Sequence, residues 1–189
     1  MHVSRLTKFN DGYILNLNKG FNFFQHSWIN FLGGFVDKGF LEHLDNIFLE
    51  GISEHGSNYL YQGFKGTINF PSWALEMCFE SVRYKEFPDK PSRFQGAFAW
   101  RDLKDAQGFI RSIGHNNAMW DIYAVEPLDA VAFLDMNLIT GDTRYFGGSV
   151  CNAMAYWNGD TPEVQGYSPT IEVLMKCPVK VLGKVPHSW

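Results

Sequence analysis

Side chains able to do chemistry are spread along the chain without the spacings of the common catalytic motifs. The six histidines show no helical pairing suited to a metal ion, and the three cysteines are too widely spaced for paired CxxC ligands. The chain contains no GxGxxG, GxxxxGKS/T, HExxH or GxSxG segment. Metal hydrolases, P-loop nucleotide hydrolases and serine hydrolases are therefore disfavoured.

One carboxylate is distinguished by its surroundings. Glu172 lies between Ile171 and Val173 in the segment 170–175, whose alternating, β-branched residues predict a strand. Successive side chains of a strand point to opposite faces, so Glu172 points away from its two apolar neighbours. This position suits a catalytic acid, and it equally suits a carboxylate that simply faces water.

Three separated segments occur in an order that is known from one superfamily. The opening strand carries His-Val-Ser-Arg at 2–5, the middle carries Pro-Ser-Arg at 91–93 followed by Gly-Ala-Phe-Ala-Trp at 96–100, and a late strand carries Thr-Ile-Glu-Val-Leu at 170–174. This order resembles the mono-ADP-ribosyltransferase superfamily. It is closest to bacterial and phage members whose first strand carries His-x-Ser/Thr, such as the DNA-targeting ADP-ribosyltransferase toxins.

The resemblance implies a single ADP-ribosyltransferase-like domain over residues 1–189, of the α+β class. Two small antiparallel sheets would pack around an NAD cleft, with helices concentrated in the first two-thirds of the chain. No alternation of strands and helices with a Gly-rich phosphate loop is present to indicate a parallel sheet instead.

The same resemblance implies which residues bind NAD. His2 would hydrogen-bond the adenosine-side ribose, Ser4 would support the nicotinamide-side pocket, and the backbone around Val3 would bind the nicotinamide amide. The ring of Phe98 would stack on nicotinamide. Arg93 would face the NAD phosphates, because a guanidinium suits bidentate contact with them. The complete set implied at the cofactor is His2, Val3, Ser4, Ser92, Arg93 and Phe98.

Glu172 would be the catalytic carboxylate. Cleavage of NAD breaks a glycosidic bond to a cationic leaving group, so the transition state resembles an oxocarbenium ion. A carboxylate that holds the ribose hydroxyls stabilises this developing charge. Nicotinamide leaves as a neutral molecule, so the reaction needs no general acid, and we expect NAD as a substrate and no metal.

The nature of the acceptor follows from a departure from the family pattern. Many relatives that modify protein side chains carry Glu or Gln two positions before the catalytic Glu, and here that position is Thr170. We therefore expect RNA or DNA ahead of a protein arginine, although a net charge of −4 gives no general attraction to nucleic acid. For a toxin, a protein inhibitor or antitoxin is a further implied partner.

Each assigned residue also has a purely structural interpretation. His2 lies where chains usually fray, Phe98 lies in a run typical of a buried strand, and Arg93 follows a proline that suits a capped turn. Tyr59 and Tyr61 suit either a substrate-side loop or a surface turn. The functions that stay open beside transfer are NAD glycohydrolysis, chemistry of the RNA 2′-phosphotransferase type, and a non-catalytic module whose aromatic groove binds a sugar, base or peptide.

Composition limits the class of protein. With 46% hydrophobic and 19% charged residues, the 189-residue chain is neither disordered nor collagen-like. No apolar run approaches the roughly 18–20 residues of a membrane helix, so we expect no membrane partner. The cysteine pattern suits a reducing cytoplasm, in a bacterium or an infected cell. Basic residues between Arg83 and Lys104 suit a solvated face or a local nucleic-acid strip.

Hydrophobic periodicity predicts short, scattered elements. Helices are expected at 40–51, 72–87, 102–113, 127–134 and 150–157. Strands are expected at 1–9, 96–100, 120–125, 170–175 and 179–182. We expect Ser72 to cap the second helix, and the last two strands to pair with each other in antiparallel fashion.

Overall fold

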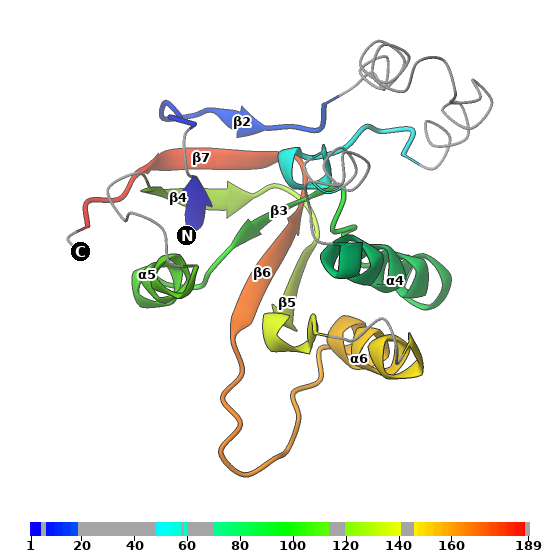
Figure 1. The fold of residues 1–189 in the computed structure, drawn as a ribbon. Coiled ribbons are helices and arrows are strands. Elements are labelled where there is room, and N and C mark those ends of the chain that lie inside the picture. The colour runs from blue at the N-terminus through cyan, green and yellow to red at the C-terminus, as the bar shows by residue number, and fades with distance from the viewer. Residues whose placement is uncertain are drawn as a thin grey trace.

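Two antiparallel sheets and the helices packed against them make up the described part of the chain (Figure 1). The structure is a computed structural model, and it describes residues 1–4, 7–18, 48–57, 59, 70–113, 120–140 and 146–187. The α+β class expected from the sequence is confirmed.

The larger sheet has four strands in the order β1-β4-β7-β2, each antiparallel to its neighbours. Helix α5 (Leu103–Ser112) packs against β1 and β4, where Ile110 meets Ile122 in a buried cluster. Asp102 caps this helix, because its carboxylate accepts a hydrogen bond from Asp105 N at 2.9 Å. The strands are β1 (His2–Ser4), β2 (Ile14–Leu15), β4 (Asp121–Pro127) and β7 (Val179–Lys184).

The smaller sheet has the order β3-β6-β5 and carries two helices on one face. Leu174 of this sheet packs against Phe79 and Trp157, and the Trp157 indole donates to the Phe79 carbonyl oxygen at 2.7 Å. Figure 1 shows α4 and α6 together on this side of the sheet, with α5 beyond its other side. The elements are β3 (Gly96–Ala99), β5 (Val131–Asp135), β6 (Ile171–Lys176), α4 (Phe70–Glu86) and α6 (Phe146–Asn158).

An apolar core lies where the two sheets face each other. Val173 and Met175 of β6 are buried here with Ala97 of β3, and they meet Val179 of β7 and Val125 of β4. These side chains fill the space between the sheets at this place. A ligand site that uses Glu172 must therefore lie on the opposite face of β6, which is the face that α4 and α6 cover.

The helix predicted over 127–134 is wrong, because residues 131–135 form strand β5. Ala132 and Leu134 are buried, whereas Phe133 between them is 53% exposed. This burial has a period of two, which is that of a strand. The apolar residues at 131 and 134 also fit a helical spacing, and pairing with β6 decides between the two.

The pairing predicted for the last two strands is also wrong. Strand β6 pairs with β3 and β5, and β7 pairs with β4 and β2, so the two strands belong to different sheets. Between them the chain crosses from one sheet to the other at Cys177 and Pro178, which are joined by a cis peptide bond. The alternation of apolar and polar residues predicted that each segment is a strand, but it does not indicate which strand each one pairs with.

The other predicted elements that fall within the described residues are present with shifted ends. Helix α4 begins at Phe70, so Ser72 lies inside its first turn and is not the cap. Helix α6 lies in the last third of the chain, beyond the region where helices were expected to concentrate. The helix predicted over 40–51 falls mostly outside the described residues, and positions 48–50 form a turn.

Candidate active site

Glu172 lies on β6 and points toward α4 and α6. It is only 4% exposed. Its Oε1 atom accepts two hydrogen bonds, from Arg93 Nη1 at 2.6 Å and from the hydroxyl of Tyr156 at 2.7 Å. The carboxylate predicted from the late strand is therefore buried and held by two donors, and it does not face water.

Arg93 connects Glu172 to a second carboxylate. Its Nε and Nη2 atoms donate to the two oxygens of Glu76 at 2.7 and 2.8 Å, which is a bidentate pair. Its Nη1 atom donates to Tyr156 Oη at 2.6 Å as well as to Glu172. All three guanidinium nitrogens are thus bonded within the protein. We call Glu76, Arg93, Tyr156 and Glu172 the carboxylate network.

The carboxylate network contains two carboxyl groups and one guanidinium group. The charges of these groups shift the pKa values of Arg93, Glu76 and Tyr156. Burial by itself would lower the pKa of Arg93, but the charges of Glu172 and Glu76 raise it well above its ordinary value. Burial opposes ionisation of Glu76, yet the Arg93 guanidinium holds the pKa of that carboxyl well below its usual range. Burial, opposed by Arg93, raises the pKa of Tyr156, so its hydroxyl stays a donor to Glu172.

Three aromatic rings lie beside the carboxylate network. The guanidinium carbon of Arg93 lies 4.7 Å from the centre of the Phe98 ring. The His55 imidazole lies 4.3 Å from Phe98 and 4.6 Å from Tyr59, centre to centre. Its Nε2 atom is 3.8 Å from Glu76 Oε1, and this buried nitrogen has no hydrogen-bond partner among the described residues. All three rings are partly exposed, in contrast to the buried carboxylate network.

A close backbone approach positions these rings. A Cβ atom on Gly56 would lie 2.2 Å from the carbonyl oxygen of Phe94, so only glycine fits there. Ser53 donates to the same oxygen through its backbone N–H at 2.9 Å and its hydroxyl at 3.1 Å. Ser92 accepts from Phe94 N at 3.1 Å, so its side chain closes the turn that carries Arg93. Gly56 directly follows His55, so this close approach fixes the backbone that places the imidazole against the Phe98 ring.

His2 connects the first strand to this region. Its Nδ1–H donates to the carbonyl oxygen of Phe98 at 2.7 Å. The strand around it is held on both sides, by pairing with Tyr123 of β4 and by the hydrogen bond from Trp100 N to the carbonyl oxygen of Met1 at 2.8 Å. Burial lowers the pKa of His2, which favours the neutral ring and leaves Nε2 as an acceptor.

Val3 does not contact the carboxylate network in the described structure. Val3 pairs with Ile122 and packs in the apolar cluster under α5. The backbone of Ser4 lies opposite Asp121 of β4. The structure therefore brings His2, Arg93, Phe98 and Glu172 into one series of contacts, while Ser92 shapes the adjoining turn.

Three members of the site were missed from the sequence, namely Glu76, Tyr156 and His55. A signal for Glu76 exists in retrospect, because Glu76, Glu80 and Arg83 follow a helical spacing beside the apolar stripe of α4 and are all buried. Tyr156 lies in a predicted short helix, where packing is favoured over contact with an acceptor, and nothing in the local sequence distinguishes His55 from a surface histidine.

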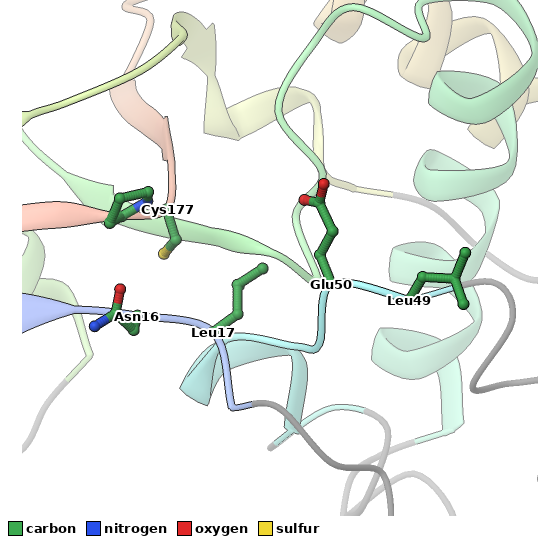
Figure 2. Close-up of a pocket in the computed structure, with 6 residues that line it drawn as sticks. Asn16, Leu17, Leu49, Glu50 and Cys177 are labelled. Carbon is green, nitrogen blue, oxygen red and sulfur yellow. The ribbon is translucent and has the colours of Figure 1, made fainter.

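Two hollows in the described structure lie away from the carboxylate network. One, of about 700 Å³, lies beside the link between β6 and β7, and Figure 2 shows Cys177 and Leu17 among the residues that line it. Burial raises the pKa of the Cys177 thiol to about 11, so it is a poor nucleophile. The other, of about 570 Å³, lies beside α5. Among the described residues, no three His, Cys, Asp or Glu side chains gather as metal ligands.

Fold and site together define an α+β protein of two antiparallel sheets, with a buried network of two carboxylates and one arginine under an aromatic cluster. The chain belongs to the family described as protein of unknown function (DUF2441), whose model matches residues 1–187. No curated protein matches it. No helix within the described ranges is long and apolar enough to cross a membrane.

Proposed function

We propose that the protein is a mono-ADP-ribosyltransferase that transfers ADP-ribose from NAD to a macromolecule and releases nicotinamide. One observation carries the proposal, which is the contact series formed by three segments far apart in the chain. His2 donates to the Phe98 carbonyl oxygen, the Phe98 ring contacts Arg93, and Arg93 bonds Glu172. Two small antiparallel sheets are compatible with an ADP-ribosyltransferase fold, which is part of the proposal.

In the proposed reaction the bond between ribose C1′ and the nicotinamide nitrogen breaks, and its electron pair returns to the ring, which leaves uncharged. A nucleophilic atom of the acceptor forms the new bond to C1′ and releases its proton to water. Glu172 stabilises the positive charge that develops on the ribose. The neutral His2 ring offers Nε2 to a ribose hydroxyl.

Arg93 acts as a positioning residue in this proposal. Its nitrogens are occupied by Glu76, Tyr156 and Glu172, so the NAD phosphates must find other donors. The nicotinamide ring would take the place of the His55 imidazole, a flat heteroaromatic ring that already lies against Phe98. Because Glu172 is 4% exposed, His55 and its neighbour Tyr59 must move before NAD reaches the carboxylate.

The test follows free nicotinamide after purified protein is incubated with NAD, with and without single-stranded DNA, RNA or a protein mixture. Glu172→Gln is the informative variant, because Gln keeps an acceptor oxygen for Arg93 and Tyr156 but loses the charge. Glu163→Gln is the matched control, since Glu163 is an exposed carboxylate on the loop before β6. Circular dichroism verifies that both variants fold.

We expect release that requires an acceptor, that Glu172→Gln lowers at least 100-fold, and that Glu163→Gln leaves unchanged. Release without any acceptor, also lost in Glu172→Gln, would replace transfer by NAD glycohydrolysis. No release from the folded protein under any condition would overturn the proposal and leave a non-catalytic binding module.

A further inference from the structure

A groove beside α5 carries positive charge on a protein that is acidic overall. It has a volume of about 570 Å³ and lies between α5, residues 136–137 and the segment 169–171 that leads into β6. Arg101, Lys104 and Arg111 line it and are exposed, and Asp105 is the one acid among the lining residues. The groove is therefore locally basic, although the whole chain has a net charge of −4.

The side chains of Arg101, Lys104 and Arg111 are exposed at the groove. None of the three forms an ion pair with another described residue, whereas elsewhere Lys176, Lys180 and Lys184 each pair with an acid. Their positions at 101, 104 and 111 place the charges along the whole length of the helix rather than at one end. A series of cations along a groove suits a chain of phosphates better than a single small anion.

Aromatic side chains accompany the charges. Phe133 of β5 is 53% exposed, and the guanidinium carbon of Arg101 lies 5.2 Å from the centre of its ring. Inside the groove, Trp100 stacks on Phe109 with ring centres 4.3 Å apart. The buried Nε1–H of Trp100 has no hydrogen-bond partner in the described structure. An exposed ring beside an unpaired arginine is typical of surfaces that stack an unpaired base.

We propose that this groove binds single-stranded nucleic acid, with Arg101, Lys104 and Arg111 on the phosphates and Phe133 stacked on a base. A duplex does not offer the face of a base to Phe133, which favours a single strand. The binding itself stands without any enzymatic activity. One part of the proposal rests on the proposed function. If the protein is an ADP-ribosyltransferase, the nucleic acid bound in the groove is the acceptor of ADP-ribose.

The position of the groove is compatible with that role. Ile171 lines the groove, and the next residue, Glu172, points to the opposite face of the same sheet. Strand β5 is one of the two edge strands of that sheet, and its Phe133 pairs with Val173. A strand held in the groove therefore reaches the Glu172 side by passing over the edge formed by β5.

The test measures the fluorescence anisotropy of a labelled 12-nucleotide dT strand with the full chain, without NAD, over a range of salt concentrations. The variant Arg101→Glu/Lys104→Glu reverses two groove charges. Lys8→Glu/Lys85→Glu reverses two exposed charges outside the groove and changes the net charge equally. Phe133→Ala removes the stacking ring without changing charge.

We expect the groove double variant to weaken binding at least 10-fold and to lower the slope of log Kd against log salt by about two, while the control double variant changes Kd less than threefold. Phe133→Ala should weaken binding at least fivefold with an unchanged salt slope. Equal losses in both double variants, duplex DNA bound as tightly as the single strand, or no binding at all would each overturn the proposal.

The result of the binding experiment can be distinguished from the result of the nicotinamide-release experiment. Glu172→Gln should bind the oligonucleotide as the wild type does, because Glu172 lies on the other face of the sheet. If the groove variants lose binding but NAD is never cleaved, the groove stands and the transferase does not. If acceptor-dependent nicotinamide release is unchanged in the groove variants, the transferase stands and the groove is not its acceptor site.

Discussion

Arg93 is the residue on which the carboxylate network depends. It is 4% exposed and bonds both Glu76 and Glu172. Truncation to Met would leave two buried carboxylates without their counter-charge, and breaking a buried pair in this way costs about 3–5 kcal/mol. We expect urea unfolding to show that loss for Arg93→Met. Glu172→Gln keeps its two donors and should cost less than about 2 kcal/mol, and equal losses would contradict this assignment.

His2 gives a prediction about pH at the residue scale. Burial lowers its pKa in the folded state, so the unfolded chain takes up the proton first, near pH 6.5. Stability is then lost as pH falls below about 6.5, with a slope of up to about 1.4 kcal/mol per pH unit, until the folded-state pKa is reached. His2→Asn keeps a donor for the Phe98 carbonyl oxygen but does not titrate.

The measurement is the free energy of unfolding of both proteins between pH 7.5 and pH 5. We expect the wild type to lose more stability than His2→Asn as the pH falls. Parallel curves would show that His2 is protonated equally in both states and would contradict its burial against Phe98.

Sequence reasoning at this scale found two members of the carboxylate network and missed the other two. Arg93 and Glu172 came from the motif resemblance, and the structure joins them, but their common partner Tyr156 and the second acid Glu76 were missed. A buried ion pair between residues 79 positions apart leaves no periodic trace in the sequence. One local pattern indicates a buried charged group. It is the helical spacing of Glu76, Glu80 and Arg83 beside the apolar stripe of α4.

At the scale of elements, the contact between residues 53–57 and the turn at 92–95 determines where the aromatic rings lie. Gly56→Ala would place a Cβ 2.2 Å from the Phe94 carbonyl oxygen and force the two segments apart. We expect a loss of about 1–3 kcal/mol of stability, as for other overpacked sites. Gly108→Ala is the matched control, because nothing lies within 4 Å of its Cβ position in α5.

Thermal unfolding checks both changes. In Gly108→Ala the better helix propensity of alanine should raise stability by about 0.5–1 kcal/mol, so the two glycine variants should shift the unfolding temperature in opposite directions. If the Gly56→Ala protein were as stable as the wild type, the backbone of the turn at 92–95 would shift at little cost. The turn would then not determine the position of His55.

Helices and strands were predicted well where the apolar residues follow a single period, either that of a helix or that of a strand. They were predicted poorly where the apolar residues fit both periods. Helices α4, α5 and α6 follow clear helical spacing, and β3, β4 and β6 are short runs bounded by turn residues. The segment of β5 was predicted as a helix because Val131 and Leu134, three positions apart, fit a helical spacing, whereas in the strand they lie on opposite faces of the sheet. The exposed Phe133 between the buried Ala132 and Leu134 follows the period of a strand, and the pairing with β6 determines which of the two periods the segment adopts.

For the whole molecule, the separation of β6 and β7 into different sheets makes the two sheets depend on each other. The core between them contains Val173 from one sheet and Val179 from the other. We therefore expect the chain to unfold as one domain, in a single transition with the same urea midpoint by far-ultraviolet circular dichroism and by tryptophan fluorescence. Sequence length predicted one domain, but the strand connection gives the physical reason.

Val173→Ala tests this dependence directly. Removing two buried methyl groups from the shared core should cost about 2 kcal/mol and lower both midpoints together. Val164→Ala makes the same chemical change at a side chain that is 65% exposed and should shift neither midpoint measurably. If Val173→Ala instead separates the transition into two steps, the sheets fold independently. The carboxylate network on the smaller sheet would then persist without the sheet that carries His2.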